Sequence, residues 1–567
     1  MKILLLHCDY IKFKPLKKAL KNIGELSEKE KKGGEIKECL VVLTAVEKCD
    51  ADVGKIVEKY CENIEDVAKQ VGAKNIVLYP YAHLSSNLGS PEIATQILNE
   101  AEKILKKNFE VVRAPFGYYK EFELKVKGHP LSELSREIKL DNKKISDEVY
   151  DYKKLLREIS KTKLDSSKLK ENDHRIIGQQ MDLFSFSEVA PGMVFWHNNG
   201  LIIYDELVNY WKEIHRKEGY QEVKTPQILD RKLWQISGHW EKYKENIFLT
   251  EYEKRIFVVK PMSCPGGLLI FKNKPKSYKE LPLRVGELGV VHRQELSGTL
   301  GGLFRVIQIT QDDAHVYCTE KQVEQEIFAI IDLIELVYKK FKFTYHVELS
   351  TRPEKRIGDE KIWDLAEKTL QKALEKKKMK FKINKGDGAF YGPKIDFHLK
   401  DSLDRTWQCA TIQLDFSMPE RFEIEYMDKD NSKKRPIMLH NVIYGSLERF
   451  IGILIEHTNG RLPTWLAPTQ VRVLNFTERN TKYAEKIIKE LKKKIPNLRI
   501  EDDFRNTTIP AKVKDAEIMR IPYIIVVGDR EEKEKSVAVR TKGDKKIKNF
   551  KIEEFAEKLE KEIEGRG

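Results

Sequence analysis

The sequence predicts a multidomain protein of mixed α/β and α+β class, and three observations support this. At 567 residues the chain is too long for a single hydrophobic core. Strand-like apolar runs alternate with amphipathic helical patterns at both ends of the chain. Between them lie longer runs with alternating apolar residues, which are typical of an antiparallel sheet. We therefore expect an α/β domain at each end of a central domain whose antiparallel sheet is flanked by helices.

The first α/β domain is expected at residues 1–140. Its strand-like runs are KILLLH, LVVLTAV, NIVLYPY and FELKVKG, and PEIATQILNEAEKILKK has the periodicity of an amphipathic helix. The next segment, 141–172, is rich in lysine, aspartate and serine, with a helical pattern in its middle and little to bury. We interpret it as a linker.

The central domain is expected at residues 173–466. Its strands are predicted at LRVGELGVVHRQE, FRVIQITQDDAHVYC, WQCATIQLDF and RPIMLHNVIYG, and its helices at DELVNYWKEIHRKEGY and SLERFIGILIEHTNG. After PTWLAP the pattern changes to a strand VRVLNF, a helix NTKYAEKIIKELKKK, a strand LRIEDDF, a helix PAKVKDAEIMRI and strands YIIVVGD and SVAVRT. The region 467–567 is therefore predicted to be a small α/β module.

Composition narrows the class of protein. Apolar residues make up 41% of the chain and charged residues 34%, which favours a folded soluble protein over a disordered or membrane one. No apolar run approaches the roughly 20 residues of a membrane span. The amino terminus, MKILLLHCDYI, has too short an apolar stretch for a signal peptide, so we expect a first strand and a cytoplasmic protein. The formal net charge of +14 suits nucleic-acid binding, although lysine-rich solvated surface explains it equally well.

Three dispersed residues form a candidate metal site. Cys264 lies in MSCPGG, His315 in TQDDAHVYC and His440 in IMLHNVIYGSLERF. One thiolate and two imidazoles that leave an open position match a catalytic zinc site. Because the three are far apart in sequence, their spacing carries no signature, and a buried cysteine with two hydrogen-bonded core histidines remains the alternative.

A second constellation is basic and surrounds a glycine-rich turn. Arg293 and Glu295 lie in VHRQELSG, Arg305 follows GTLGGLF, and Arg449 stands at the head of a predicted helix. Guanidinium groups suit the oxygens of a polyphosphate. The sequence has neither a Walker loop nor a dinucleotide-binding fingerprint, so an ATP bound here would lie on the antiparallel sheet.

These segments resemble known motifs. HRQELSG…FRVIQITQDDAH and GSLERFIGIL resemble motifs 2 and 3 of class II aminoacyl-tRNA synthetases, and GYQEVKTPQIL resembles motif 1, the usual dimer-interface element. SGHWEKYKENIF, MSCPGG, QDDAHVYC, YGPKIDF, WQCATIQLDF and IMLHNVIYGSLERFIGILIEH resemble the threonyl enzyme. MKILLLHCDYI, YPYAHLSS and APFGYYKEF…KGHPLSELSR resemble its archaeal editing domain, which is similar to D-aminoacyl-tRNA deacylases. Over nearly its whole length the chain thus resembles the archaeal-type threonyl-tRNA synthetases.

The resemblance implies an activity and its partners. We expect ATP-dependent activation of L-threonine to threonyl-adenylate, transfer to the 3′-hydroxyl of tRNA(Thr), and hydrolytic editing of seryl-tRNA(Thr) by a homodimer. It also implies Mg²⁺ with ATP and one Zn²⁺ per subunit, whose open position would take threonine's amino group and hydroxyl. Valine is nearly isosteric with threonine, so a site that requires a hydroxyl rejects valine, whereas serine passes and needs a second, hydrolytic site.

The resemblance also implies residue roles in the central domain. The zinc ligands would be Cys264, His315 and His440. Threonine would be surrounded by Gln311, Asp313, Tyr391 and Gln413. Arg293 would bind the α-phosphate of ATP, Arg305 and Arg449 the distal phosphates, and Glu295 the adenine. Lys394 and Gln408 would assist at the α-phosphate, and His239 is the candidate proton acceptor in transfer to the tRNA.

The chain departs from the commoner bacterial pattern at three positions. Ile309 stands where a phenylalanine usually stacks on adenine, Gly267 replaces a histidine after CPG, and Asn441 replaces an arginine after His440. We therefore expect an adenine platform that is apolar but less aromatic.

The terminal domains carry two further sets of candidates. In the editing domain, His83, Tyr119, Lys120 and Glu133 would hold the seryl ester and place a water. From the residues alone, a helix cap and a solvated strand end would also explain these four editing candidates. In the last domain, Asn506, Glu531 and Arg540 stand at the family's base-reading positions and would bind the anticodon.

Two other functions remain open at this point. A synthetase-like regulator could bind RNA without making aminoacyl-adenylate, although damaged motif arginines would be expected and Arg293, Arg305 and Arg449 are present. A class II enzyme for another amino acid, such as proline or serine, would share the core but not the cysteine and histidine set.

Overall fold

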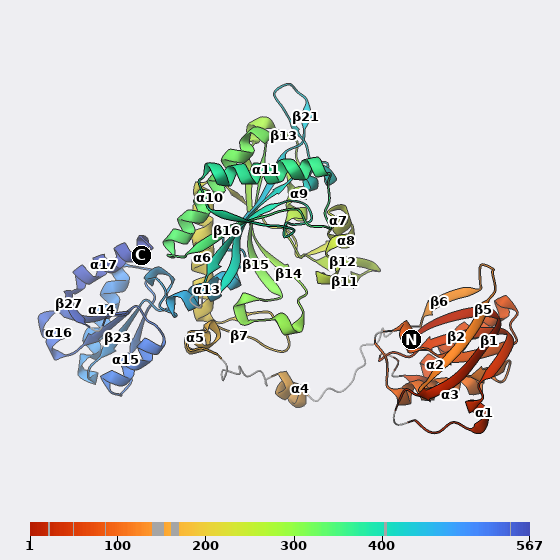
Figure 1. Ribbon diagram of the computed structural model, residues 1–567. Coiled ribbons are helices and arrows are strands. Elements are labelled where there is room, and N and C mark those ends of the chain that lie inside the picture. Colours follow the sequence, from red (N-terminus) through yellow and green to blue (C-terminus); the bar gives the residue numbers. More distant parts are fainter. Residues whose placement is uncertain are drawn as a thin grey trace. The chain divides into compact units, whose positions relative to one another are not determined.

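The computed structural model describes residues 1–20, 23–48, 50, 52–85, 87–138, 152–159, 169–401, 405–544 and 546–566. It divides into two compact units, Met1–Tyr150 and Asp151–Gly567 (Figure 1). The predicted linker, 141–172, lies mostly outside the described residues. Within it the structure describes a helix, α4 (Tyr152–Ile159), where the sequence shows its helical pattern.

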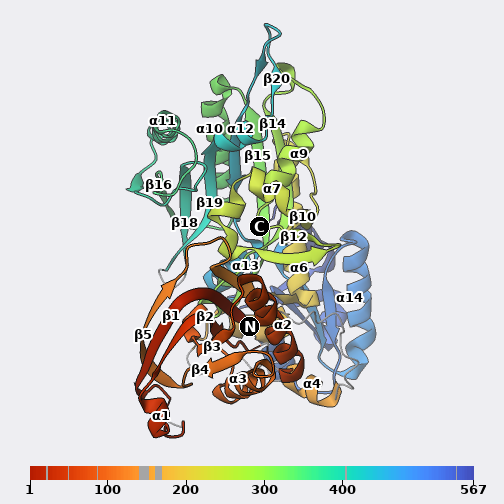
Figure 2. The ribbon, with the colours of Figure 1, turned by 90° about the vertical axis from the view of Figure 1, so that its right-hand side faces the viewer.

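The first unit is a mixed sheet with the strand order β4-β3-β2-β1-β5, in which β6 also pairs with β1. The strands are β1 (Lys2–Lys18), β2 (Gly34–Ala45), β3 (Asn75–Pro80), β4 (Glu110–Arg113), β5 (Tyr118–Val126) and β6 (Glu133–Glu137). The helices are α1 (Glu28–Lys31), α2 (Val53–Val71) and α3 (Pro91–Leu105), with a 3₁₀ turn, η1 (Ala82–Leu84). Alternating residues of β2 enter separate cores: Leu40 and Val42 pack with α2 and α3, and Val41 and Leu43 pack on the other face. Both helices lie against the same side of this sheet (Figure 2).

The central part of the second unit is an eight-stranded sheet with the order β17-β16-β18-β19-β22-β15-β14-β9. The strands are β9 (Gln221–Glu222), β14 (Leu283–His292), β15 (Gln308–Cys318), β16 (Tyr345–Ser350), β17 (Phe381–Asn384), β18 (Lys394–Lys400), β19 (Thr406–Asp415) and β22 (Ile437–Val442). The predicted antiparallel sheet is confirmed for the six inner strands. The short edge strands β9 and β17 pair in parallel with their neighbours.

Helices bury one face of this sheet. The helices of this part of the chain, not all of which lie on that face, are α5 (His174–Gln180), α6 (Asn198–Lys217), α7 (Arg231–Ile236), α8 (His239–Lys242), α9 (Cys264–Lys272), α10 (Val323–Lys340), α11 (Glu360–Lys376), α12 (Ser417–Arg421) and α13 (Leu447–Thr458). Apolar residues of α6, α10, α11 and α13 form one large core with alternate residues of the inner strands. The intervening strand residues, among them Gln413 and His440, face the other side, so polar side chains gather there.

The last part of the second unit is a five-stranded sheet with the order β24-β23-β25-β26-β27. Its elements are β23 (Val471–Asn475), α14 (Thr481–Lys494), β24 (Ile500–Asp503), α15 (Ile509–Ile518), β25 (Tyr523–Val527), α16 (Asp529–Glu534), β26 (Ser536–Thr541), β27 (Ile547–Lys551) and α17 (Ile552–Glu564). Helices α14 and α17 share one core with the sheet, and α15 lies in another. A salt bridge of 2.6 Å from Arg499 to Glu206 joins this module to α6.

Short strands complete the second unit. They are β7 (Phe184–Ser185), β8 (Phe195–Trp196), β10 (Ile228–Asp230), β11 (Phe248–Tyr252), β12 (Arg255–Val259), β13 (Lys276–Ser277), β20 (Tyr426–Met427) and β21 (Lys433–Lys434). Within the part of the chain that the structure describes, every helix is too short or too polar to cross a membrane.

Candidate active site and metal centre

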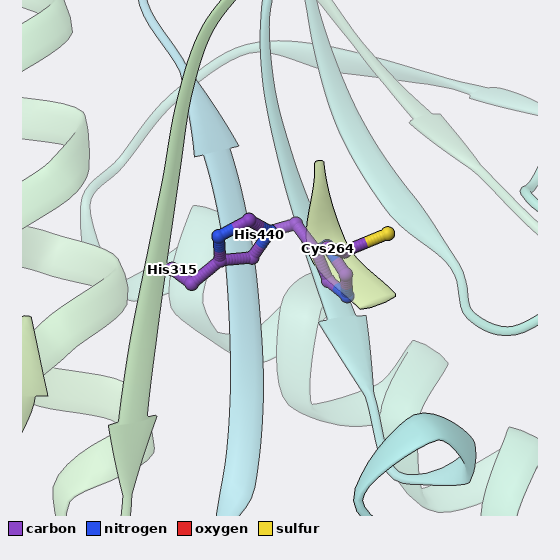
Figure 3. Close-up of side chains that lie close together, drawn as sticks. All are labelled: Cys264, His315 and His440. Carbon is purple, nitrogen blue, oxygen red and sulfur yellow. The ribbon is translucent and has the colours of Figure 1, made fainter. Parts of the chain in front are cut away.

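The three candidate metal ligands lie together on the polar face of the central sheet. Cys264 begins α9, and His315 on β15 is the direct cross-strand partner of His440 on β22. One ligand atom from each lies within 4.8 Å of the others (Figure 3). The sheet register therefore brings together two histidines that are distant in sequence, and the start of α9 adds the thiol.

The surroundings of these side chains favour a cation. Burial raises the pKa of the Cys264 thiol well above its usual value, so a thiolate here requires a positive partner. Burial also lowers the pKa of His315 to about 4, which keeps its ring neutral. His315 Nε2 is buried without a hydrogen-bond partner. His440 Nε2 lies 2.9 Å from a carboxylate oxygen of Asp415, an arrangement that orients metal-binding imidazoles.

A cavity of about 360 Å³ adjoins this cluster. Of the candidate residues, its lining includes Cys264, Arg293, Gln311, Asp313, Tyr391, Lys394, Gln408, Gln413, His440 and Arg449. The Tyr391 hydroxyl donates to Gln413 Oε1 at 2.9 Å, which fixes both side chains beside the metal cluster. The cavity thus combines the predicted threonine pocket with most of the predicted phosphate-binding residues.

The arginines are held by backbone carbonyls as well as by side chains. Arg449 donates from Nε to Phe304 O at 2.9 Å and from Nη1 to Gln408 O at 3.0 Å. Burial lowers the pKa of Arg449, and the nearby Arg305 and Arg293 lower it further. Two guanidinium groups, those of Arg293 and Arg449, line the cavity beside a single carboxylate, Asp313, and such a lining suits an anionic ligand.

The two remaining nucleotide candidates form a pair of their own. Arg305 Nε donates to Glu295 Oε2 at 2.9 Å, and the Arg305 side chain is 50% exposed. Neither residue lines the cavity among the described residues. Arg305 and Glu295 therefore form an ion pair outside the cavity lining.

Lys394 and Gln408 converge on one buried carboxylate. Lys394 Nζ lies 2.7 Å from Asp396 Oδ2, and Gln408 Nε2 donates to Asp396 Oδ1 at 2.6 Å. Asp396 is 1% exposed, so its charge is balanced mainly by the Lys394 ammonium. Asp396 thereby fixes the positions of both candidate residues.

His239 lies behind the cavity wall. It is fully buried, with ring nitrogens 2.8 Å from Ser237 Oγ and 2.9 Å from Met262 Sδ, and its ring packs against Phe390. Burial lowers the pKa of His239 to about 3. Phe390 lines the cavity and His239 does not, so His239 reaches a ligand only if this wall moves.

The three departures from the bacterial pattern all lie at or near this site. Ile309 and Asn441 line the cavity. A Cβ added at Gly267 would stand 4.0 Å from His315 Nδ1 and 3.7 Å from the Tyr317 hydroxyl, so a larger residue there would face the metal cluster.

Some residues of the site were missed by sequence reasoning. Asp415, the partner of His440, lies in the predicted strand WQCATIQLDF, but its role depends on the register between β19 and β22. The role of Asp312 was not predicted either. Its carboxylate accepts the backbone N–H groups of Ile443, Tyr444 and Gly445 at 2.8–2.9 Å. This arrangement fixes the turn between β22 and α13. In the sequence, the only indication of this role was the pair of adjacent aspartates in TQDDAH.

In the first unit, Lys120 and His83 are linked through aromatic rings. Lys120 Nζ lies 5.0 Å from the centre of the Tyr79 ring, which packs against Tyr81, and Tyr81 contacts His83. Burial lowers the pKa of Lys120 to about 8. Tyr119 precedes Lys120 on β5, so its side chain points to the opposite face of the sheet from that of Lys120. It is 56% exposed.

The other candidates of the terminal domains lie apart from one another. Glu133 starts β6 opposite Leu6 of β1. Glu531 accepts the backbone N–H of Gly528 at 2.9 Å and so caps α16. Arg540 lines a separate cavity of about 330 Å³ with three further cations, Arg461, Arg520 and Lys542. Asn506 lies in the loop after β24. No contact joins Asn506, Glu531 and Arg540 among the described residues.

Comparison with known families agrees with this architecture. Residues 1–138 match the Archaea-specific editing domain of threonyl-tRNA synthetase, residues 248–458 the class II core domain of tRNA synthetases for G, H, P, S and T, and residues 470–562 an anticodon binding domain. The prolyl-tRNA synthetase of Cryptosporidium parvum, 16% identical, covers 69% of this chain and 77% of its own with a TM-score of 0.56, and shows the shared fold. The central domain has the fold of a class II aminoacyl-tRNA synthetase.

Individual relatives indicate which class II family the chain belongs to. The threonine–tRNA ligases of Desulforamulus reducens and Carboxydothermus hydrogenoformans are 51% and 52% identical over 70% of this chain. The chain spans about 62% of the length of these curated relatives. A solved structure described as the RNA binding domain of threonyl-tRNA synthetase from Cryptosporidium parvum is 38% identical, with a TM-score of 0.66, over 68% of this chain and 98% of its own. The chain therefore belongs to the threonyl-tRNA synthetase family.

Proposed function

We propose that this protein is a threonine–tRNA ligase that activates L-threonine with ATP, transfers it to tRNA(Thr) and hydrolyses mischarged seryl-tRNA(Thr). The observation that carries this proposal is the juxtaposition of the Cys264, His315 and His440 cluster with a cavity lined by Arg293 and Arg449. The cluster suits an amino acid with a hydroxyl group, and the arginines suit a polyphosphate. The proposed activity needs both in one place.

The donor set of the cluster fits Zn²⁺. One thiol and two imidazoles supply three ligands, Asp415 orients His440, and the buried Nε2 of His315 lacks a partner. When bound, zinc would offer an open coordination position that prefers a substrate hydroxyl over a methyl group. Gln311, Asp313, Tyr391 and Gln413 line the same cavity and would bind the amino group and hydroxyl of threonine.

The cationic half of the cavity would bind ATP with Mg²⁺. Arg293 would hold the α-phosphate, and Arg305 and Arg449 the distal phosphates, with Glu295 reading the adenine. Lys394, fixed by Asp396, and Gln408 would stabilise charge on the α-phosphate as the threonine carboxylate attacks it in line. His239 would accept a proton in the transfer step after the wall at Phe390 shifts.

The other domains would complete the reaction cycle. His83, Tyr119, Lys120 and Glu133 would act in editing, and Asn506, Glu531 and Arg540 in anticodon binding; the cationic cavity beside Arg540 supports an anionic ligand there. We also propose a cytoplasmic homodimer, with domain limits at 1–140, 141–172, 173–466 and 467–567.

The first test is threonine-dependent ATP–pyrophosphate exchange, followed by charging of tRNA(Thr) and clearance of seryl-tRNA(Thr). Exchange with threonine, weaker exchange with serine and almost none with valine supports the proposal. Exchange that depends on proline instead would overturn it.

A further inference from the structure

A second set of metal-ligating side chains lies on the central sheet, separate from the cysteine and histidine cluster. His346 and Glu348 belong to β16, and His398 belongs to the adjacent strand β18. One ligand atom from each residue lies within 4.8 Å of the others. The proposed synthetase chemistry uses none of the three.

The strand register explains why they converge. His346 and His398 are direct cross-strand partners, and their rings stack with centroids 4.9 Å apart and an interplanar angle of 10°. Glu348 follows two residues after His346, so it shares the same face of the sheet. Val347 and Phe397 point the other way, into the large core, so this core anchors both strands beneath the three polar side chains.

The distances fit ligands around one ion better than they fit hydrogen bonds. His346 Nε2 lies 3.4 Å from Glu348 Oε1, and His398 Nε2 lies 3.6 Å from Glu348 Oε2. Good N–H···O bonds measure about 2.7–3.2 Å. Ligands about 2.0–2.1 Å from a tetrahedral metal stand about 3.3–3.4 Å apart, close to the observed spacing.

An unsatisfied nitrogen points to a ligand at this place. His398 Nε2 is buried and has no hydrogen-bond partner, a state that costs free energy unless something else fills the position. Glu348 is held from the other side by Asn384 of β17, whose Nδ2 donates to Glu348 Oε2 at 3.1 Å. Such a partner orients a metal-binding carboxylate. The side chain of His346 is 37% exposed, which gives an ion access from solvent.

We propose that His346, Glu348 and His398 bind a divalent transition-metal ion of the zinc type. Two imidazoles and one carboxylate suit Zn²⁺, Co²⁺ or Ni²⁺, whereas Ca²⁺ and Mg²⁺ prefer oxygen ligands alone. The ion cross-links β16 to β18. Because His398 is paired with Gln408 of β19, whose side chain lines the central cavity, the site lies beside the proposed ATP pocket.

A second cluster of potential metal ligands differs, because both of its histidine ring nitrogens have hydrogen-bond partners. Asp173, His174 and Glu456 also gather their ligand atoms within 4.8 Å. There, His174 Nδ1 lies 2.8 Å from Glu456 Oε1, and His174 Nε2 accepts the backbone N–H of Leu303 at 3.0 Å. Both ring nitrogens are satisfied without an ion, so this cluster is a structural network. Among the described residues, His398 Nε2 has no such hydrogen-bond partner.

Metal binding to the full chain tests the proposal, in a Cys264→Ser background that disables the first cluster. The chelator-treated protein is titrated with Zn²⁺ by calorimetry, and its metal content is measured after gel filtration. Cys264→Ser should retain one equivalent of zinc, and adding His398→Gln should remove it or weaken binding at least tenfold. Adding His197→Gln is the matched control, because the His197 ring lies beside Asp182 and Ser185, outside the cluster. This variant should retain the equivalent.

Cobalt distinguishes the two clusters by spectrum. Co²⁺ bound to Cys264 gives a thiolate charge-transfer band, and Co²⁺ on His346, Glu348 and His398 gives only weaker visible bands. The proposal expects the visible bands to persist in Cys264→Ser and to vanish with His398→Gln. Equal zinc content and equal cobalt spectra in the two variants would overturn it. If the His398→Gln variant fails to fold, His346→Gln, at a more exposed position, replaces it with the same expected loss.

Discussion

At the scale of single residues, the buried thiol of Cys264 is the most informative group. Burial raises its pKa, so without a cation it would remain a protonated, inert thiol. Beside it, His315 Nε2 has no hydrogen-bond partner, and His440 is oriented by Asp415. A packed core needs none of these three arrangements, whereas a metal site uses all of them.

We predict that Cys264→Ser lowers zinc content and threonine-dependent pyrophosphate exchange together, the latter by about 10²-fold or more, because the ion and its open position are lost. Cys318→Ser is the matched control, since Cys318 is equally buried on β15 but belongs to the apolar core. Both quantities are measured on one preparation. Undiminished exchange in metal-free protein would contradict the assignment.

A second prediction at this scale concerns Lys120 in the first unit. Lys120→Ala should slow clearance of seryl-tRNA(Thr) and leave threonine activation almost unchanged. Since burial lowers the pKa of Lys120 to about 8, the charged form predominates below pH 8 and is lost above it.

The advantage of wild type over Lys120→Ala in deacylation should therefore shrink between pH 7 and pH 9. Lys120→Arg keeps the charge over this range and serves as the control. An advantage that stays constant across these pH values would show that the ammonium charge plays no part in editing.

At the scale of elements, the turn between β22 and α13 positions Arg449. Asp312 accepts three backbone N–H groups of this turn, and Gly445 adopts a φ of +77° there. A Cβ on Gly445 would lie 2.5 Å from Cys409 O, so the chain passes too close to β19 for any other residue. The turn therefore sets where α13 begins and how Arg449 enters the cavity.

We predict that Asp312→Asn weakens ATP binding and lowers the free energy of unfolding by about 1–3 kcal/mol, because the amide offers only one acceptor oxygen to three backbone donors. Denaturant unfolding and the KM for ATP measure the two effects. Asp332→Asn, at a side chain that is 62% exposed on α10, is the control and should change neither. An unchanged KM for ATP in Asp312→Asn would show that this turn does not contribute to nucleotide binding.

The sequence predicted the principal elements because their periodicity is strong. The runs behind β14, β15, β19 and β22 alternate clearly, and the antiparallel inner sheet is confirmed. The sequence did not reveal the parallel edge strands, since β9 has only two residues and β17 is half exposed. The pairing of His346 with His398 was missed for a related reason: register depends on contacts between distant strands, which local pattern does not encode.

The same distinction holds for the site. Motif resemblance supplied Cys264, His315 and His440, although spacing alone gave no metal signature. Asp415 and Asp396, which fix His440 and Lys394, are buried carboxylates whose roles appear only when the strands are paired. The resemblance of its motif predicted that His239 acts on the substrate. Its burial behind Phe390 could not be predicted, because it depends on how distant segments pack.

At the scale of the whole molecule, the chain consists of two compact units, Met1–Tyr150 and Asp151–Gly567. Each has hydrophobic cores of its own. The candidate editing residues belong to the first unit, and the cavity and metal cluster belong to the second. Activation and editing should therefore be separable functions.

We predict that a fragment of residues 152–567 activates threonine at about the rate of the full chain but accumulates seryl-tRNA(Thr). Activation persists because the cavity and its supporting core are complete within this fragment, and editing is lost with the first unit. Pyrophosphate exchange and a serine mischarging assay measure the two activities. Clearance of seryl-tRNA(Thr) by the fragment would place editing in the second unit.

The most direct test of the central claim is amino-acid-dependent ATP–pyrophosphate exchange with threonine, serine and valine, on protein assayed for zinc. We predict exchange with threonine, weaker exchange with serine and almost none with valine, since valine lacks a hydroxyl and the methyl that serine lacks contributes only about 1–3 kcal/mol. Equal exchange with threonine and valine would contradict hydroxyl selection at the metal cluster, and silence with all three amino acids would contradict the proposed activity itself.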